Sequence, residues 1–174
     1  MSSWNIIPFK EREYILTNDD RTLIRCSPSS KPDIVKLMSS MEEHDVPISY
    51  TKFLREIYFT RLPGGDHGDY HDDRVRLAAD KKTALVLGKV FVHELAHHLD
   101  DHEDIVSDDH LFREKKKCAK HMSDAYAKKN VGEYLAVGFE VFYFGAAVEK
   151  AKLRKMNPRL YKTIAALHRK FSRL

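Results

Sequence analysis

The fold is decided by the stretch Phe91-Val92-His93-Glu94-Leu95-Ala96-His97-His98-Leu99-Asp100-Asp101, which contains the motif H-E-x-x-H. If residues 83 to 100 form a helix, His93 and His97 lie one turn apart on the same face. Two imidazoles placed in this way can bind one zinc ion, and Glu94 then lies beside the metal. This arrangement is typical of a zinc peptidase.

The sequence around the motif has the pattern of a helix. No proline interrupts residues 83 to 100, and Asp80 precedes them as the expected N-cap. Apolar side chains recur around the predicted helix at Leu85, Leu87, Val90, Val92, Leu95 and Leu99. The alternative is a buried helix whose two motif histidines are hydrogen-bonded core residues.

Length and composition are those of a globular domain. The 174 residues can bury about 70% of the unfolded surface without disulfides or metals, so we expect a single domain over residues 1 to 174. The net charge of +4 among 32% charged residues is modest, so neither nucleic acid nor a membrane surface is an expected partner. Cys26 and Cys118 are too few for a disulfide framework and are expected to be reduced.

No run of the sequence reaches the length of a membrane span, and the N-terminus lacks the apolar core of a secretory leader. As written, the chain is therefore predicted to be a cytoplasmic monomer. The alternative is a secreted protein, or an effector delivered by a route that uses no leader.

The first part of the chain is predicted to form a small sheet and one helix. Residues 12 to 26 alternate around a polar turn at residues 18 to 20, which predicts two short strands. Pro32 begins a predicted amphipathic helix that ends near Glu43. Residues 54 to 62 have the aromatic and β-branched content of a buried strand.

A turn-rich loop at residues 63 to 73 leads into a predicted strand at residues 74 to 78. Because this strand immediately precedes the motif helix, we expect it to form the sheet edge beside the metal cleft. An extended peptide can add to such an edge through main-chain hydrogen bonds. The histidines and acids of the loop are explained by a polar hairpin, with a second metal site as the alternative.

The part of the chain after the motif is predicted to be mainly helical. Residues 100 to 109 hold six acids and are expected to form a loop. Helices are predicted at residues 110 to 122 and 131 to 148, and Asn157 and Pro158 begin a last one. The expected class is α+β, with a small mixed sheet packed on the motif helix and a mainly helical C-terminal half.

A catalytic zinc usually takes a third protein ligand, which must come from outside the motif. The predicted core helix carries two carboxylates, Glu133 and Glu140, and each needs a partner if it is buried. Glu133 fits either the third ligand or a capping box with Asn130. Glu140 lies about two turns on and fits a partner of a ligand better than a ligand. His98 points away from the face of the motif histidines.

Two separated motifs resemble the catalytic domain of anthrax lethal factor and its small relatives, which include the bacterial Pro-Pro endopeptidases. One is the run from His93 to Asp101, and the other places Tyr126 seven residues before Glu133 and the run Tyr134-Leu135-Ala136-Val137-Gly138-Phe139. The resemblance covers roughly residues 54 to 145. It implies a zincin-like metallopeptidase fold.

The resemblance also implies roles for individual residues. In that family two motif histidines and a later glutamate bind one zinc ion, and a tyrosine seven residues before the glutamate assists the oxyanion. These roles fall here on His93, His97, Glu133 and Tyr126. Lethal factor has an acid one turn after the ligand glutamate that orients a histidine, whereas this chain has Val137. Support for the histidine must then come from Glu140, Asp100 or a backbone carbonyl.

The predicted function is a zinc-dependent metalloendopeptidase that acts on a peptide or protein bound in extended form. Zinc would lower the pKa of its bound water toward about 7, and Glu94 would accept the proton as general base and pass it to the leaving amine. One alternative is a gluzincin of another family that cleaves a regulator. The other is a non-catalytic binding or toxin-like module in which the zinc is structural.

Overall fold

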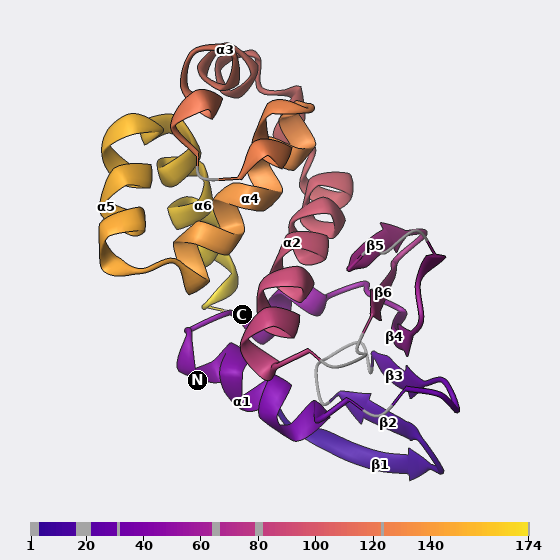
Figure 1. Ribbon diagram of the computed structural model, residues 1–174. Coiled ribbons are helices and arrows are strands. Elements are labelled where there is room, and N and C mark those ends of the chain that lie inside the picture. The colour runs from indigo at the N-terminus through magenta and orange to yellow at the C-terminus, as the bar shows by residue number, and fades with distance from the viewer. Residues whose placement is uncertain are drawn as a thin grey trace.

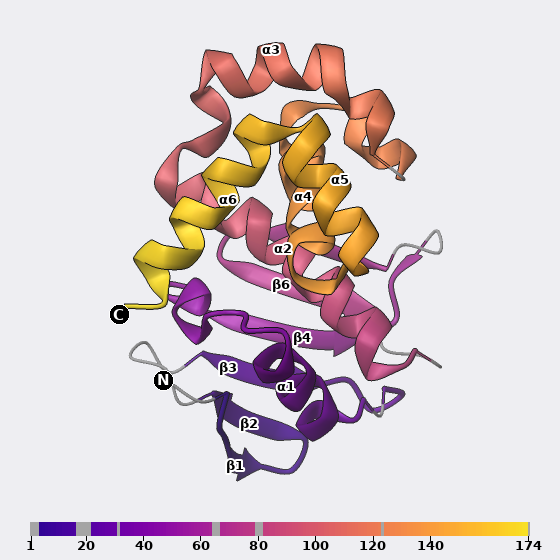
Figure 2. The same cartoon turned by 90° about the vertical axis from the view of Figure 1, so that its left-hand side faces the viewer.

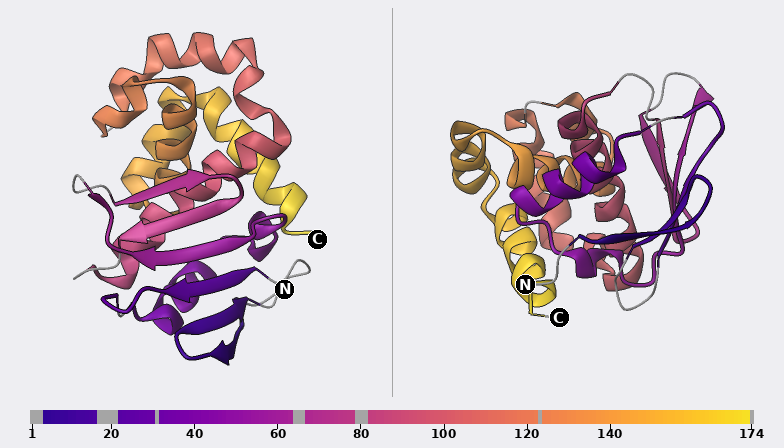
Figure 3. Two further views of the ribbon diagram at one scale, coloured as in Figure 1. Left: turned by 90° about the vertical axis from the view of Figure 1, so that its right-hand side faces the viewer. Right: turned by 90° about the horizontal axis from the view of Figure 1, so that it is seen from below.

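The computed structural model describes residues 4–16, 22–30, 32–63, 67–78, 82–122 and 124–173. A sheet forms one side of the molecule, and the labelled helices all lie on the other side (Figure 1). The left panel of Figure 3 shows the face of the sheet that the helices leave uncovered. The prediction of an α+β fold with a small mixed sheet and a mainly helical C-terminal half is confirmed.

The strands lie in the order β1-β2-β3-β4-β6-β5. Their bounds are Ile6–Lys10 for β1, Glu13–Leu16 for β2, Leu23–Cys26 for β3, Glu56–Thr60 for β4, Gly68–His71 for β5 and Arg74–Ala78 for β6. Neighbours β3 and β4 are parallel, as are β4 and β6. The remaining neighbours are antiparallel, so the sheet is mixed.

Alternating burial identifies the face of the sheet that meets the helices. Ile57 and Phe59 of β4 are buried, and so are Val75 and Leu77 of β6, while the side chains between them are at least partly exposed. Successive side chains of a strand point to opposite faces. The buried rows therefore pack beneath α1 (Ile34–Glu43) and α2 (Ala84–Glu103), which cross the sheet in Figure 2.

The predicted strands are present, but the edge of the sheet differs. The strands predicted within residues 12 to 26 are β2 and β3, and their turn at residues 18 to 20 lies outside the described residues. The predicted loop at residues 63 to 73 contains β5, which pairs with β6 as a hairpin. The expectation that residues 74 to 78 form the sheet edge is therefore wrong, because β5 takes that place.

α2 begins within one residue of the predicted start, but its N-cap and its end differ from the prediction. Thr83 is its N-cap, and the Thr83 hydroxyl oxygen accepts a hydrogen bond from the N–H of Val86 at 3.3 Å. The prediction of Asp80 as N-cap is wrong, and Asp80 itself lies outside the described residues. The helix continues to Glu103, within the segment predicted to be a loop, and ends where Asp104 adopts a φ of 50°.

The α-helices described in the C-terminal half are α3 (Asp109–Cys118), α4 (Val131–Phe144), α5 (Ala147–Met156) and α6 (Pro158–Phe171). The single helix predicted over residues 131 to 148 is wrong, because the chain turns at Gly145. There the N–H of Ala146 donates to a carboxylate oxygen of Glu149 at 2.8 Å and begins α5. No helix within the described ranges is long and apolar enough to cross a bilayer.

Close packing of α2 on α4 depends on a glycine. A Cβ atom at Gly88 of α2 would lie 2.8 Å from Cζ of Phe144 of α4, which is closer than real Cβ contacts. Phe144 is buried and stacks on His44 at a centroid distance of 4.2 Å, so the ring has little room to move. Gly88 therefore sets how closely the two helices approach.

Gly88→Val is expected to lower the free energy of unfolding by about 1–3 kcal/mol, because the added methyl groups overpack this contact. Urea denaturation measures the change. Leu85→Val, at an exposed position of the same helix, is the control, because it places a valine in α2 without the steric contact. Valine forms helices better than glycine does, so helix propensity does not explain a loss of stability in Gly88→Val. Equal stability of the two variants would contradict the close contact.

Candidate active site

α2 and α4 bring the motif histidines and Glu133 together. His93 Nε2 lies 3.1 Å from Oε2 of Glu133, and His97 Nε2 lies 3.9 Å from the same oxygen. One ligand atom from each of the three side chains lies within 4.8 Å of the other two. Residues about forty positions apart in the sequence thus converge on one point.

The cap of α4 explains how Glu133 reaches the histidines. The side-chain oxygen of Asn130 accepts a hydrogen bond from the N–H of Glu133 at 2.8 Å, which is one half of the expected capping box. The carboxylate of Glu133 is directed at His93 and His97. The cap therefore holds the backbone of the first turn of α4, while the carboxylate of Glu133 lies beside His93 and His97.

His93 lies between two carboxylates of α4. Its Nδ1 is 2.7 Å from Oε1 of Glu140, and since an ionised carboxylate only accepts, Nδ1 is the donor. Glu133 and Glu140 lie two turns apart on one face of α4, so one imidazole reaches both. Val137 between them is buried, with 2% of its surface exposed. Asp100 instead accepts a hydrogen bond from the N–H of Val106 at 2.7 Å.

Burial and charge act differently on the two histidines. Burial lowers the pKa of His97, and the charge of His93 lowers it further. Burial also acts to lower the pKa of His93, but the hydrogen bond to Glu140 and the nearby carboxylates raise it above its ordinary value. The surroundings of His93 therefore favour a positive charge at this point.

Glu94 lies on α2 close to β5, and only 6% of its surface is exposed. Burial raises its pKa to about 7, against the opposing charge of His93. A carboxylate with this pKa can accept and release a proton near neutral pH. The strand approaches closely because residue 68 is glycine: a Cβ atom there would lie 2.8 Å from Oε1 of Glu94.

A cleft of about 830 Å³ lies over these residues. β5 and the turn that follows it line one side, and α4 with the segment around Tyr126 lines the other. Tyr126 is 46% exposed, and Nζ of Lys129 lies 3.3 Å from the centroid of its ring. The structure thus places Tyr126 on the wall of the same cleft as Glu94 and the three converging side chains.

The lining of the cleft is acidic although the whole chain is basic. Five aspartates contribute to it in addition to the glutamates: Asp69, Asp72, Asp100, Asp101 and Asp124. Asp69 is paired with Arg76 at 2.6 Å. Lys129 is the only lysine or arginine among the described residues of the lining. The negative potential of the cleft is therefore local and cannot be read from the net charge of +4.

The donor set fits zinc. Two imidazole nitrogens and one carboxylate oxygen are a common catalytic set, which leaves a fourth position open. The distances from Oε2 of Glu133 to Nε2 of His93 and of His97 are 3.1 and 3.9 Å. They lie on either side of the roughly 3.3 Å between two ligand atoms of a tetrahedral zinc ion. Glu140 supplies the hydrogen bond to Nδ1 that orients a ligating histidine.

The sequence did not identify β5 as a strand. The available signal was the pair Asp72-Asp73, since a two-residue turn between alternating segments indicates a hairpin. Both residues adopt positive φ, 48° and 58°. Neither residue is the glycine or asparagine that commonly marks such a turn, so the sequence indicated the hairpin only weakly.

Residues 77–167 match a family model described as anthrax toxin lethal factor, N- and C-terminal domain. The solved structure of the Pro-Pro endopeptidase PPEP-2 from Paenibacillus alvei is similar in fold, with a TM-score of 0.59 and 17% sequence identity. The similarity covers 83% of this chain and 96% of that chain. A comparison with curated proteins gave no match.

Glu140→Gln is expected to weaken zinc binding by about 10- to 100-fold, because the neutral amide orients and polarises His93 less than the carboxylate does. Competition with a zinc-binding dye measures the affinity. Glu149→Gln, at the start of α5 and outside the cleft, is the matched control. Equal affinity of Glu140→Gln and the parent chain would show that Glu140 does not support the site.

Proposed function

The chain belongs to the anthrax toxin lethal factor family, and from that premise we propose that it is a zinc-dependent metalloendopeptidase. The observation that carries the proposal is the convergence of His93, His97 and Glu133 in a cleft that also holds Glu94. Each of the four side chains has the chemistry that hydrolysis of a peptide bond requires.

His93, His97 and Glu133 are proposed to hold one zinc ion. Bound there, zinc supplies a Lewis acid that polarises a carbonyl oxygen and lowers the pKa of a water ligand. Glu140 keeps the Nδ1 proton of His93 in place and so directs Nε2 toward Glu133. The cap at Asn130 holds the first turn of α4 in the position from which Glu133 reaches both histidines.

Glu94 is proposed to be the general base. Its carboxylate accepts a proton from the attacking water and later donates that proton to the nitrogen of the leaving peptide. Burial suits it to this role, since the raised pKa makes the protonated form accessible near neutral pH. A nearby dication would lower this pKa and favour the ionised form that begins the reaction.

Tyr126 is proposed to donate a hydrogen bond to the oxyanion that forms as water attacks. Its exposed ring on the cleft wall leaves it accessible to a bound peptide. Loss of such a donor typically costs about 3 kcal/mol of transition-state stabilisation. Lys129, whose ammonium group lies over the ring, helps to hold the side chain in place.

The substrate is proposed to bind in extended form along β5. This strand is the last in the order of the sheet and lines the cleft, so a peptide can pair with its outer edge through main-chain hydrogen bonds. The aspartates of the lining favour lysine and arginine side chains in that peptide. The substrate class is therefore a cationic segment of a peptide or protein.

Glu94→Gln is expected to retain one zinc at the proposed catalytic site and to lower kcat by about 10²–10⁴-fold, because the amide cannot accept the proton. Glu133→Gln is expected to lose that zinc together with the activity. Metal content and hydrolysis of a mixed peptide library, followed by mass spectrometry, give both readouts.

Undiminished cleavage by zinc-loaded Glu94→Gln would exclude Glu94 as the base. A parent chain that binds zinc at His93 and His97 but cleaves no peptide would favour a non-catalytic zinc module.

Peptides flanked by lysines are expected to be cleaved with a kcat/KM roughly tenfold above that of matched peptides flanked by glutamates. The difference should shrink as salt is raised from about 0.05 to 0.5 M, because salt screens exposed charges. Initial rates at low substrate concentration measure it. A preference for the acidic peptides would contradict the proposed role of the cleft aspartates.

A further inference from the structure

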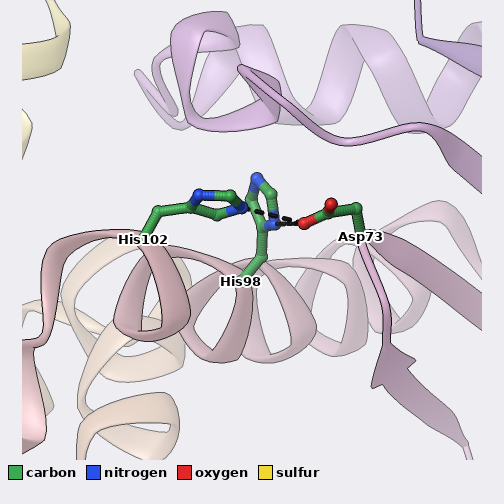
Figure 4. Close-up of side chains that lie close together, drawn as sticks. All are labelled: Asp73, His98 and His102. Atoms are coloured by element: carbon green, nitrogen blue, oxygen red, sulfur yellow. Dashed lines mark hydrogen bonds and ion pairs between the residues drawn. The ribbon is translucent and has the colours of Figure 1, made fainter.

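α2 carries a second pair of histidines one turn apart, His98 and His102. This pair is rotated by about 140° around the helix from His93 and His97. Figure 4 shows that Asp73, from the turn between β5 and β6, points at both rings. One ligand atom from each of the three side chains lies within 4.8 Å of the other two.

His98 presents a nitrogen lone pair to this cluster. The side chain is 1% exposed, and its Nε2 lies 2.8 Å from the carbonyl oxygen of Lys52. A carbonyl only accepts, so Nε2 carries the hydrogen and Nδ1 of the neutral ring is an acceptor. Nδ1 faces Oδ1 of Asp73, another acceptor, at 3.7 Å.

Asp73 is held toward the helix by its place in the turn. It is the second residue of a two-residue hairpin turn and adopts a φ of 58°, a conformation that favours glycine or asparagine. Its Oδ1 lies 2.8 Å from Nε2 of His102.

Hydrogen bonding alone leaves the cluster with more acceptors than protons. The hydroxyl of Tyr70 has one hydrogen, and it lies 3.3 Å from Oδ1 of Asp73 and 3.4 Å from Nδ1 of His98. It also interacts with the carboxylate of Asp101. Oδ1 of Asp73 can accept a hydrogen from Nε2 of His102, but the one hydrogen of Tyr70 cannot serve both Nδ1 of His98 and Asp101. A cation bound by Asp73 and His98 satisfies Nδ1 and leaves that hydrogen to Asp101.

We propose that Asp73 Oδ1, His98 Nδ1 and His102 Nε2 form a second site for a divalent transition metal, with zinc as the ion best suited to it. Two imidazoles and a carboxylate are zinc ligands, and the partial exposure of Asp73 and His102 leaves room for water to complete the coordination. Oδ1 of Asp73 lies 2.8 Å from Nε2 of His102 and 3.7 Å from Nδ1 of His98. These distances lie on either side of the roughly 3.3 Å expected between two ligand atoms of a tetrahedral zinc ion.

An ion at this site fastens the β5–β6 turn to α2. β5 lines the cleft and reaches Glu94 through Gly68, so the ion stabilises one wall of the cleft without contacting it. The role is structural, and the chain binds two zinc ions in all if the proposed catalytic site is also filled.

The full chain, stripped with EDTA and dialysed against zinc, tests this by metal analysis. Two ions are expected in the parent chain, one in Asp73→Asn, one in Glu133→Gln and none in the double variant. Asparagine keeps the shape, the turn conformation and the hydrogen bond from His102, but loses the charge that binds the ion. His102→Phe, which keeps the stacking on Phe53, is also expected to bind one.

Asp72→Asn, in the same turn, and His110→Phe, at an exposed position of α3, are the controls and are expected to bind two ions. Asp73→Asn with undiminished zinc, or Glu133→Gln with none, would overturn the proposal. One ion in the parent chain that persists in Glu133→Gln and is lost in Asp73→Asn would support this site and argue against the catalytic one.

Thermal unfolding of Glu133→Gln gives a second readout. Zinc at about 100 times its dissociation constant is expected to raise the Tm by roughly 5–10 °C, because the ion binds only the folded chain. The rise should vanish when Asp73→Asn is added and remain when Asp72→Asn is added. A rise of the same size in both double variants would contradict the assignment of the ligands.

Discussion

The imidazole of His93 is held between Glu133 and Glu140, and the candidate site depends on this contact between α2 and α4. Carboxylates on a helix packed against another helix lose much of their hydration, and hydrogen bonds or opposite charges must offset that loss. Here the single ring of His93 lies within hydrogen-bond distance of both carboxylates. The contact also fixes how far α4 can turn relative to α2, since rotation of either helix would leave at least one carboxylate without its partner.

The two walls of the cleft are built in different ways. One wall is helical and is set by the approach of α2 to α4 at Gly88, where buried rings leave no space for a side chain. The other wall is a strand that reaches α2 because Gly68 also lacks a side chain. Two glycines twenty residues apart therefore set how closely α4 and β5 approach α2, although neither has a functional group.

The sequence predicted the parts of the site that follow from helical periodicity. The motif histidines share a face because four residues make about one turn, and Glu133 and Glu140 share one because seven residues make about two. From the sequence, Glu140, Asp100 and a backbone carbonyl all stayed open as the partner of His93, because that choice depends on the angle at which two helices meet. Only the packed structure supplies that angle.

The errors in the predicted elements have local physical causes. A hairpin turn made of two aspartates carries no glycine signal, so β5 was taken for a loop and β6 for an edge. The apolar run from α4 into α5 hides the turn at Gly145, because alanine and glycine continue the composition of a core helix. Asp104 ends α2 in the left-handed region, which aspartate enters less readily than glycine does.

Because β5 and α4 are both packed on α2, the cleft has a single rigid element as its floor. Opening or closing it requires one wall to separate from a helix whose inward side chains, such as Phe91 and Leu95, are wholly buried. A peptide that bound as proposed would therefore meet walls that are already in place. Binding would then order the peptide and would require little reorganisation of the protein. Peptide segments that are already extended before binding would lose the least conformational entropy.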